Sequence, residues 1–213
     1  MNRGEPFHLE GPPGTAVDGF IHRPGDDLHT AIVLAHGAGS NADAPQLIQS
    51  AAAFCDAGIL ALRIHLPFRL LRKGPPHPST ASLDREGLRA AANAVRRLGA
   101  RKVILAGHSY GGRQASMLLA EDPSAADALL LLSYPLHPPD KPHQLRTAHF
   151  PSLRTPTLFV HGTKDPFATI AELREAIAAI PAQPQLIEVP NAGHDLRKLP
   201  LPGIVPRTLA LLP

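Results

Sequence analysis

The stretch VILAGHSYGGRQAS, residues 103–116, leads an apolar tract directly into a serine that three glycines surround. Gly107, Gly111 and Gly112 all lie close to Ser109 in the chain. Glycine destabilises a helix or strand interior by roughly 0.5–1 kcal/mol relative to alanine, so three of them here indicate a steric requirement. A G-x-S-x-G pattern between an apolar strand and a helix predicts a sharp, strained turn that holds the serine hydroxyl clear of the backbone.

Outward from this stretch, short apolar runs alternate with longer amphipathic segments. We expect strands at residues 7–9, 16–22, 31–35, 59–65, 102–106, 128–133, 157–161 and 185–189. We expect helices at residues 45–57, 83–98, 111–120, 170–180 and 204–212. Continuous apolar strands separated by helices predict an α/β fold, with a mainly parallel sheet covered by helices on both faces. No break in composition divides the chain, so we expect a single domain over residues 1–213.

Polar motifs follow four of the expected strands. They are HGAG at 36–39, GHSYGG at 107–112, KDPF at 164–167 and NAGHD at 191–195. Right-handed crossovers bring the carboxyl ends of parallel strands to one edge of the sheet, where ligands bind. The four motifs therefore predict one functional site at this edge.

A serine hydroxyl is a weak nucleophile at neutral pH unless a base accepts its proton. Folds with this kind of turn supply the partners in the chain order serine, acid, histidine. Asp165 and His194 follow later strands in that order, so we predict Ser109 as nucleophile, His194 as base and Asp165 as the residue that orients the imidazole. Asp140 is a competing acid, and Asp195 is expected to point away from the site.

The same chemistry requires hydrogen-bond donors for a developing oxyanion. The backbone N–H of Tyr110 follows the nucleophile and is expected to be one donor. We expect the second donor in the HGAG motif, at Ala38 or alternatively at Gly37. His36 begins that motif and is a candidate for substrate binding, with bracing of the loop through hydrogen bonds as the alternative.

Further candidates for substrate binding lie close to the predicted turn. Phe167 and Tyr110 are expected to line the pocket. Arg113 lies in the first turn of the helix behind Ser109, where it holds either a substrate carboxylate or a neighbouring Asp or Glu. The proline-rich segment 135–153 is expected to roof the site.

Composition restricts the function classes. The chain has 213 residues, a formal net charge of +3 and scattered basic residues, which does not favour a nucleic-acid surface. No apolar run approaches the length of a membrane span, and no secretory h-region follows the first residues. The single Cys55 excludes an intramolecular disulfide and fits a reducing compartment, so we expect a cytoplasmic protein.

We expect no metal and no other cofactor. Three histidines, His137, His143 and His149, lie in the proline-rich segment. Their spacing matches none of the compact ligand patterns of metal sites, and no cysteine accompanies them.

Six motifs together carry a resemblance to a known family. The motifs HGAG, GHSYGGR, YPLHPP-x-KP, LR-x-x-HF, GT-x-D-P-F and GHD resemble the small α/β-hydrolase family that includes testis-expressed protein 30 and the hydrolase-like subunit of an animal chromatin-modifying complex. Bacterial members are similar to dienelactone hydrolases. The resemblance covers residues 30 to 195 and implies an α/β-hydrolase fold without an inserted cap domain, with the triad on Ser109, Asp165 and His194.

Two departures accompany the resemblance. His65 stands where a smaller polar residue is expected, which concerns the pocket wall. Dienelactone hydrolases use a cysteine nucleophile, so Ser109 argues against that activity.

Two functions from different classes fit these features. The first is a serine hydrolase that cleaves an ester or related acyl bond of a small substrate through an acyl-enzyme; amides and thioesters share this chemistry. The second is a non-catalytic interaction module that keeps the hydrolase fold. A module has no physical reason to retain strain at Ser109, so we favour the enzyme.

Overall fold

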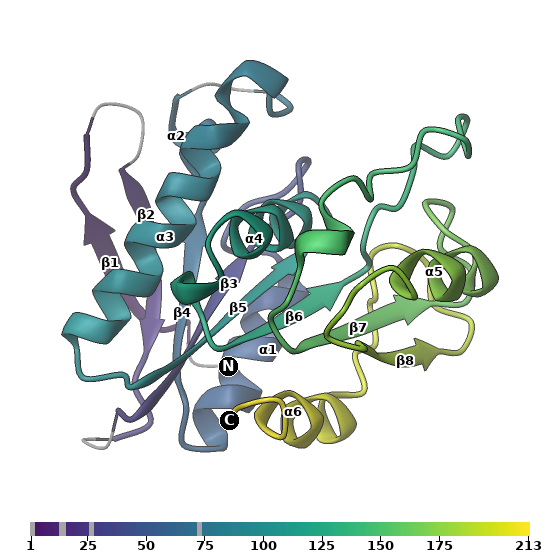
Figure 1. Cartoon of the computed structure of the whole chain (residues 1–213). Helices are drawn as coiled ribbons and strands as arrows, with labels where there is room; N and C mark the ends of the chain where they lie inside the picture. The colour runs from purple at the N-terminus through teal and green to yellow at the C-terminus, as the bar shows by residue number, and fades with distance from the viewer. Residues whose placement is uncertain (1–2, 13–15, 26–27, 72–73) are drawn as a thin grey trace.

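One sheet organises the part of the chain that the computed structural model describes, residues 3–12, 16–25, 28–71 and 74–213. Its eight strands are arranged in the order β1-β2-β4-β3-β5-β6-β7-β8 (Figure 1). The strands are β1 Glu5–Leu9, β2 Val17–His22, β3 Thr30–Ala35, β4 Leu60–His65, β5 Lys102–His108, β6 Ala128–Leu132, β7 Thr157–Gly162 and β8 Gln185–Val189. Strands β3 to β8 are parallel, whereas β1 and β2 pair antiparallel at one edge.

Helices cover both faces of the sheet (Figure 1). The α-helices are α1 Pro45–Asp56, α2 Pro67–Leu71, α3 Ala81–Arg97, α4 Tyr110–Glu121, α5 Ile170–Ile177 and α6 Leu201–Leu209. Residues of α3, α4 and α5 share one apolar cluster with the sheet. Residues of α1 and α6 belong to a second cluster on the opposite face. The predicted α/β architecture is confirmed.

In β3, β5 and β6 the residues between the strand ends are apolar, because each face of the sheet is covered. In β5, Val103 and Leu105 belong to the cluster under α3 and α4, whereas Ile104 belongs to the cluster under α1 and α6. All three side chains are fully buried. This alternation follows from the two-residue period of a strand.

Element boundaries differ from expectation in a few places. Strand β5 runs on to His108, the residue before the turn, and the five-residue α2 has no counterpart among the expected helices. Helix α6 begins at Leu201 rather than at residue 204. Pro202 is tolerated in the first turn because backbone N–H groups there have no acceptor within the helix, so the missing N–H of proline breaks no hydrogen bond. The expected GPPG turn at residues 11–14 lies partly outside the described residues.

The connection from β6 to β7 is long but has little regular structure. Residues 133–156 are all described, and their regular structure is a single turn of 3₁₀-helix, Phe150–Ser152. No cap domain is therefore inserted between β6 and β7. Across the described segments, no helix combines the length and the apolarity that crossing a membrane requires.

Candidate active site

Ser109 occupies a sharp turn between β5 and α4. Its backbone has φ 51° and ψ −116°, in a region that non-glycine residues rarely adopt. The Ser109 N–H donates to the carbonyl of Leu132 at 2.9 Å, which ties the turn to the end of β6. The Ser109 side chain is thus presented at the carboxyl edge of the sheet.

The glycines around this turn are required by contact with neighbouring backbone. A Cβ on Gly111 would lie 2.6 Å from the carbonyl oxygen of His36, at the end of β3. A Cβ on Gly112 would lie 2.6 Å from the oxygen of Gly107, and one on Gly107 would overlap the nitrogen of Gly112. The steric explanation predicted from the sequence is confirmed.

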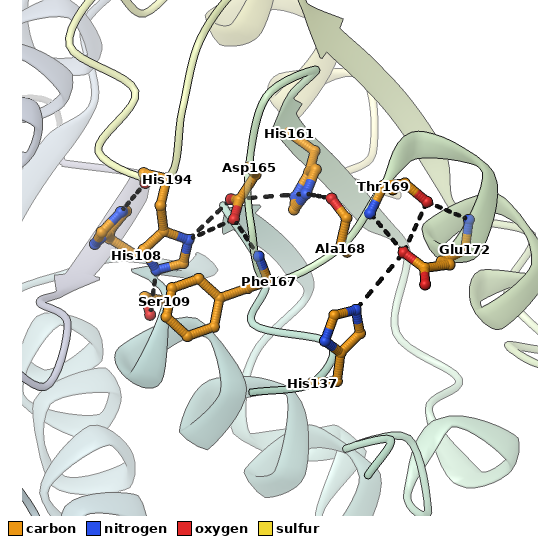
Figure 2. Close-up of polar contacts among 10 residues, drawn as sticks. All are labelled: His108, Ser109, His137, His161, Asp165, Phe167, Ala168, Thr169, Glu172 and His194. Atoms are coloured by element: carbon orange, nitrogen blue, oxygen red, sulfur yellow. Dashed lines mark hydrogen bonds and ion pairs between the residues drawn. The ribbon is translucent and has the colours of Figure 1, made fainter. Parts of the chain in front are cut away.

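His194 lies between Ser109 and Asp165, although 85 positions separate it from the serine in the chain (Figure 2). It comes from the loop between β8 and α6. The His194 Nε2 is 2.8 Å from the Ser109 Oγ, and its Nδ1 is 2.8 Å from the Asp165 Oδ2. With Nδ1–H donating to the carboxylate, Nε2 is left to accept the serine proton.

Asp165 follows β7, and its side chain is fully buried. Burial raises the pKa of this carboxyl, but hydrogen bonds from His194 and from the Phe167 N–H outweigh that effect and lower the pKa below its ordinary value. The Nε2 of His161 lies 3.6 Å from the Asp165 Oδ2 and also contacts the carbonyl of Ala168 at 3.1 Å. Asp165 is therefore a carboxylate at neutral pH, held on several sides (Figure 2).

The competing acids lie elsewhere. Asp195 is exposed and forms an ion pair with Arg197, with 2.5 Å between its Oδ2 and the arginine Nε. Asp140 lies in an exposed turn of the β6–β7 connection. Of these three acids, only Asp165 contacts the imidazole of His194.

Two further side chains hold His194. The ring of Phe167 stacks on the imidazole, with 4.2 Å between ring centroids and 33° between planes. The Nε2–H of His108 donates to the backbone carbonyl of His194 at 2.7 Å. His108, which the sequence marks only as a residue of the turn or the strand end, thus links β5 to the loop that carries His194 (Figure 2).

His36 is not placed to bind substrate. It is fully buried and does not line the cavity beside Ser109. Its Nδ1–H donates to the carbonyl of Gly37 at 2.8 Å, and its Nε2 accepts the N–H of Leu66 at 3.1 Å. The substrate-binding expectation for His36 is wrong because both ring nitrogens are used to brace the loop. His65 is likewise outside this cavity and accepts the N–H of Ala42 at 3.2 Å.

Arg69, a residue of α2, holds the same loop from the other side. Its Nη2 donates to the carbonyl of Ala38 at 2.6 Å, and its Nε donates to the carbonyl of Ser40 at 3.0 Å. These contacts engage the carbonyl oxygens of Ala38 and Ser40. The N–H of Tyr110 belongs to the first turn of α4, where a helix supplies no acceptor.

A buried carboxylate supports the turn from behind. The Tyr110 hydroxyl donates to the Asp84 Oδ2 at 2.6 Å, and the Phe68 N–H donates to the Oδ1 at 2.9 Å. Burial raises the pKa of Asp84 above its ordinary value. Asp84 was not among the expected site residues, because its helical position alone does not distinguish it from a solvated acid.

A cavity of about 910 Å³ opens in front of Ser109. The loop at residues 37–40, the first turns of α4, Phe167 and His194 form one side of it. The proline-rich residues 75–78 form a wall that the sequence did not predict. The expected roof, residues 135–153, contributes Pro135 and Arg146.

A serine, an imidazole and a buried carboxylate in hydrogen-bonded series, on the carboxyl edge of this sheet, are the arrangement of α/β serine hydrolases. The chain belongs to the family described as alpha/beta hydrolase domain, whose sequence model matches residues 28–204.

Solved structures show the same fold. A serine hydrolase homologue from Coxiella burnetii is 17% identical, with a TM-score of 0.77 over 100% of this chain and 99% of that one. A serine hydrolase without a lid from Xanthomonas campestris is 18% identical, with a TM-score of 0.75 over 100% and 97% of the two chains. A dienelactone hydrolase from Anabaena variabilis is 23% identical, with a TM-score of 0.73 over 99% and 96%.

Proposed function

We propose that this protein is a serine hydrolase that cleaves an ester or related acyl bond of a small substrate. The observation that carries the proposal is the 2.8 Å contact between the Ser109 Oγ and the His194 Nε2, in series with the contact to Asp165. A base within hydrogen-bond reach of a serine, itself oriented by a carboxylate, is the geometry that nucleophilic catalysis requires.

Acylation follows from this geometry. His194 Nε2 accepts the Ser109 proton while Oγ forms a bond to the substrate carbonyl carbon, whose oxygen becomes negatively charged. The N–H groups of Tyr110 and Ala38, with Gly37 as the alternative, donate to that oxygen. When the tetrahedral species collapses, the bond to the leaving alcohol breaks, and the alcohol takes its proton from His194.

Deacylation repeats the same steps with water. His194 removes a proton from water, the hydroxide oxygen bonds to the acyl carbon, and the bond to Ser109 Oγ breaks as Oγ regains a proton. Asp165 remains ionised throughout and stabilises the imidazolium. No step requires a cofactor.

The substrate belongs to the small acyl compounds, with esters first and thioesters and amides sharing the chemistry. A cavity of about 910 Å³ is within the range of small-molecule sites. We further propose a cytoplasmic enzyme with no nucleic-acid partner, related to the branch that includes testis-expressed protein 30.

A fluorophosphonate probe tests the proposal. We expect the folded protein to be labelled at Ser109 at pH 8, as read by mass spectrometry, and the Ser109→Ala variant to remain unlabelled. A series of p-nitrophenyl esters of increasing acyl length then defines the preferred acyl group. Failure of the folded wild-type protein to react with the probe would favour the non-catalytic interaction module.

A further inference from the structure

Arg113 has a donor without an acceptor. It lies in the first turn of α4 and lines the cavity in front of Ser109. Its Nε is buried and has no hydrogen-bond partner, and among the described residues no carboxylate oxygen lies within 4.0 Å of its guanidinium. The alternative in which Arg113 pairs with a neighbouring Asp or Glu is therefore wrong. A cation at this end of a helix is opposed by the helix dipole, so its charge is uncompensated.

Gln114 supplies a second unmatched donor. Its side chain is fully buried, and its Oε1 accepts a hydrogen bond from the Arg85 Nη1 at 3.2 Å. That contact fixes the amide so that the Nε2 is left without an acceptor. Arg85 itself is balanced, because its Nε is 3.1 Å from the Glu121 Oε2. Arg85 thus orients Gln114 while its own charge is neutralised.

Arg146 brings a second uncompensated charge to the same cavity. Its backbone is fixed in the β6–β7 connection: the Tyr134 hydroxyl donates to its carbonyl at 2.6 Å, and its N–H donates to the carbonyl of Leu136 at 2.8 Å. Burial lowers the pKa of Arg146, and the positive charge of Arg113 lowers it further. The two guanidinium charges therefore repel each other, and an anion bound between them would relieve that repulsion.

The carboxylate and guanidinium groups that could charge the wall of the cavity are unequally represented in favour of positive charge. Among the described residues that line it, Arg85, Arg113 and Arg146 are present, and none is Asp or Glu. Buried donors in proteins are almost always paired, so unpaired donors on two residues that line a cavity point to a ligand that supplies acceptors.

We propose that Arg113 and Arg146, with the amide of Gln114, bind a carboxylate on the substrate, so that the substrate is an ester with a free carboxylate a few bonds from the scissile carbonyl. A planar guanidinium matches a carboxylate with paired hydrogen bonds. Arg113 lies one helical turn beyond Ser109, and its N–H donates to the Ser109 carbonyl at 2.9 Å, which places the anion close to the reacting centre. This substrate class rests on the proposed hydrolase function.

Paired esters test the substrate class. We expect kcat/KM for the p-nitrophenyl monoester of glutaric acid to exceed that for p-nitrophenyl pentanoate, a neutral ester of equal length, by about tenfold or more. Arg113→Met and Arg146→Met should each reduce this ratio about tenfold, mainly through KM of the charged ester. Arg97→Met, which removes an exposed arginine at the end of α3, is the matched control and should leave the ratio unchanged.

Calorimetry provides a readout that does not depend on turnover. We expect the Ser109→Ala variant to bind glutarate, and Ser109→Ala with Arg113→Met to lose that binding. Equal turnover of both esters, a ratio that survives both Met substitutions, or tighter binding of inorganic phosphate than of glutarate would overturn the carboxylate site while leaving the hydrolase intact. Absence of both ester turnover and fluorophosphonate labelling, with glutarate still bound, would instead remove the hydrolase and keep the anion site.

Discussion

Arg69 joins two segments that meet only in the folded protein. It belongs to α2, and its guanidinium donates to the carbonyl of Ala38, which lies 31 positions earlier in the chain. The same guanidinium lies over the ring of Phe68, 4.9 Å from its centroid. The position of the Ala38 N–H therefore depends on a side chain that does not touch the reacting atoms.

Replacing Arg69 with methionine should loosen this loop. Loss of one oxyanion donor costs roughly a factor of 10²–10³ in kcat, so we expect a less rigid loop to lower kcat about tenfold with little change in KM. Arg69→Lys should recover only part of the rate, since an ammonium group cannot reproduce the two-pronged contact. Steady-state kinetics with p-nitrophenyl butyrate measure both; a raised KM at unchanged kcat would assign Arg69 to substrate binding instead.

At the scale of elements, the contact between α4 and the ends of β3 and β5 determines the geometry around Ser109. Gly111 begins this contact, because the carbonyl of His36 leaves no room for a side chain at that position. The start of the helix can therefore pack directly against the backbone at the end of β3.

We predict that Gly111→Ala displaces α4 and damages stability and site together. Overpacking of this kind typically costs about 1–3 kcal/mol of unfolding free energy, and fluorophosphonate labelling should fall sharply. Gly203→Ala, at an exposed position of α6 where a Cβ meets nothing within 4 Å, is the matched control and should be neutral or stabilising by up to about 1 kcal/mol. Urea denaturation of both variants checks the result, and equal stabilities would contradict the steric explanation.

Elements differ in how well their sequence predicts them. The central strands were predicted because covered strands are continuously apolar, as in AIVLA and ALLLL. Helix α2 was missed because its five residues, PFRLL, are too short for an amphipathic pattern and follow directly on a strand. Arg69 was missed along with it. The wall at residues 75–78 has a composition typical of any loop, and only the tertiary fold places it beside the cavity.

At the scale of the whole molecule, folding keeps several imidazoles neutral. Burial lowers the pKa of His36 and of His149 to about 4, and the charge of Arg113 adds to the effect at His149. The His36 Nε2 accepts the N–H of Leu66, so a proton on that nitrogen would face another donor. The unfolded chain has no such restriction and binds protons near pH 6.5.

The unfolding free energy should therefore fall as the pH drops from about 6.5 to about 4, because the unfolded chain binds more protons in that interval. For His36 alone the loss is about 3 kcal/mol. Asp165, whose pKa lies below its ordinary value of 3.8, adds to the loss only at the lower end of this interval, and Asp84, whose pKa burial raises, opposes the loss. Urea denaturation across the interval measures the slope; His149→Gln should reduce it, and an unchanged unfolding free energy would refute the neutral assignment.

The site was predicted as far as chain order determines it. Ser109, Asp165 and His194 each follow a strand, and parallel topology brings strand ends together, so the proximity of these three candidate residues could be predicted from the sequence. Arg146 could not, because its guanidinium reaches the cavity only through the path of an irregular connection. Asp84 and His108 owe their contacts to tertiary packing in the same way. The pattern of apolar residues predicts where helices and strands end. The positions of side chains on irregular segments can be known only from the folded structure.

His194, the proposed base, lies on the loop after β8, 85 positions after Ser109 in the chain. When residue 109 leaves the ribosome, its hydroxyl has no imidazole to accept a proton and is chemically inert. On the proposed mechanism, Ser109 becomes reactive only when β8 has paired with β7 and His194 lies beside the hydroxyl. If the proposed mechanism holds, an incompletely folded chain lacks the reactive serine, so fluorophosphonate labelling would report completed folding.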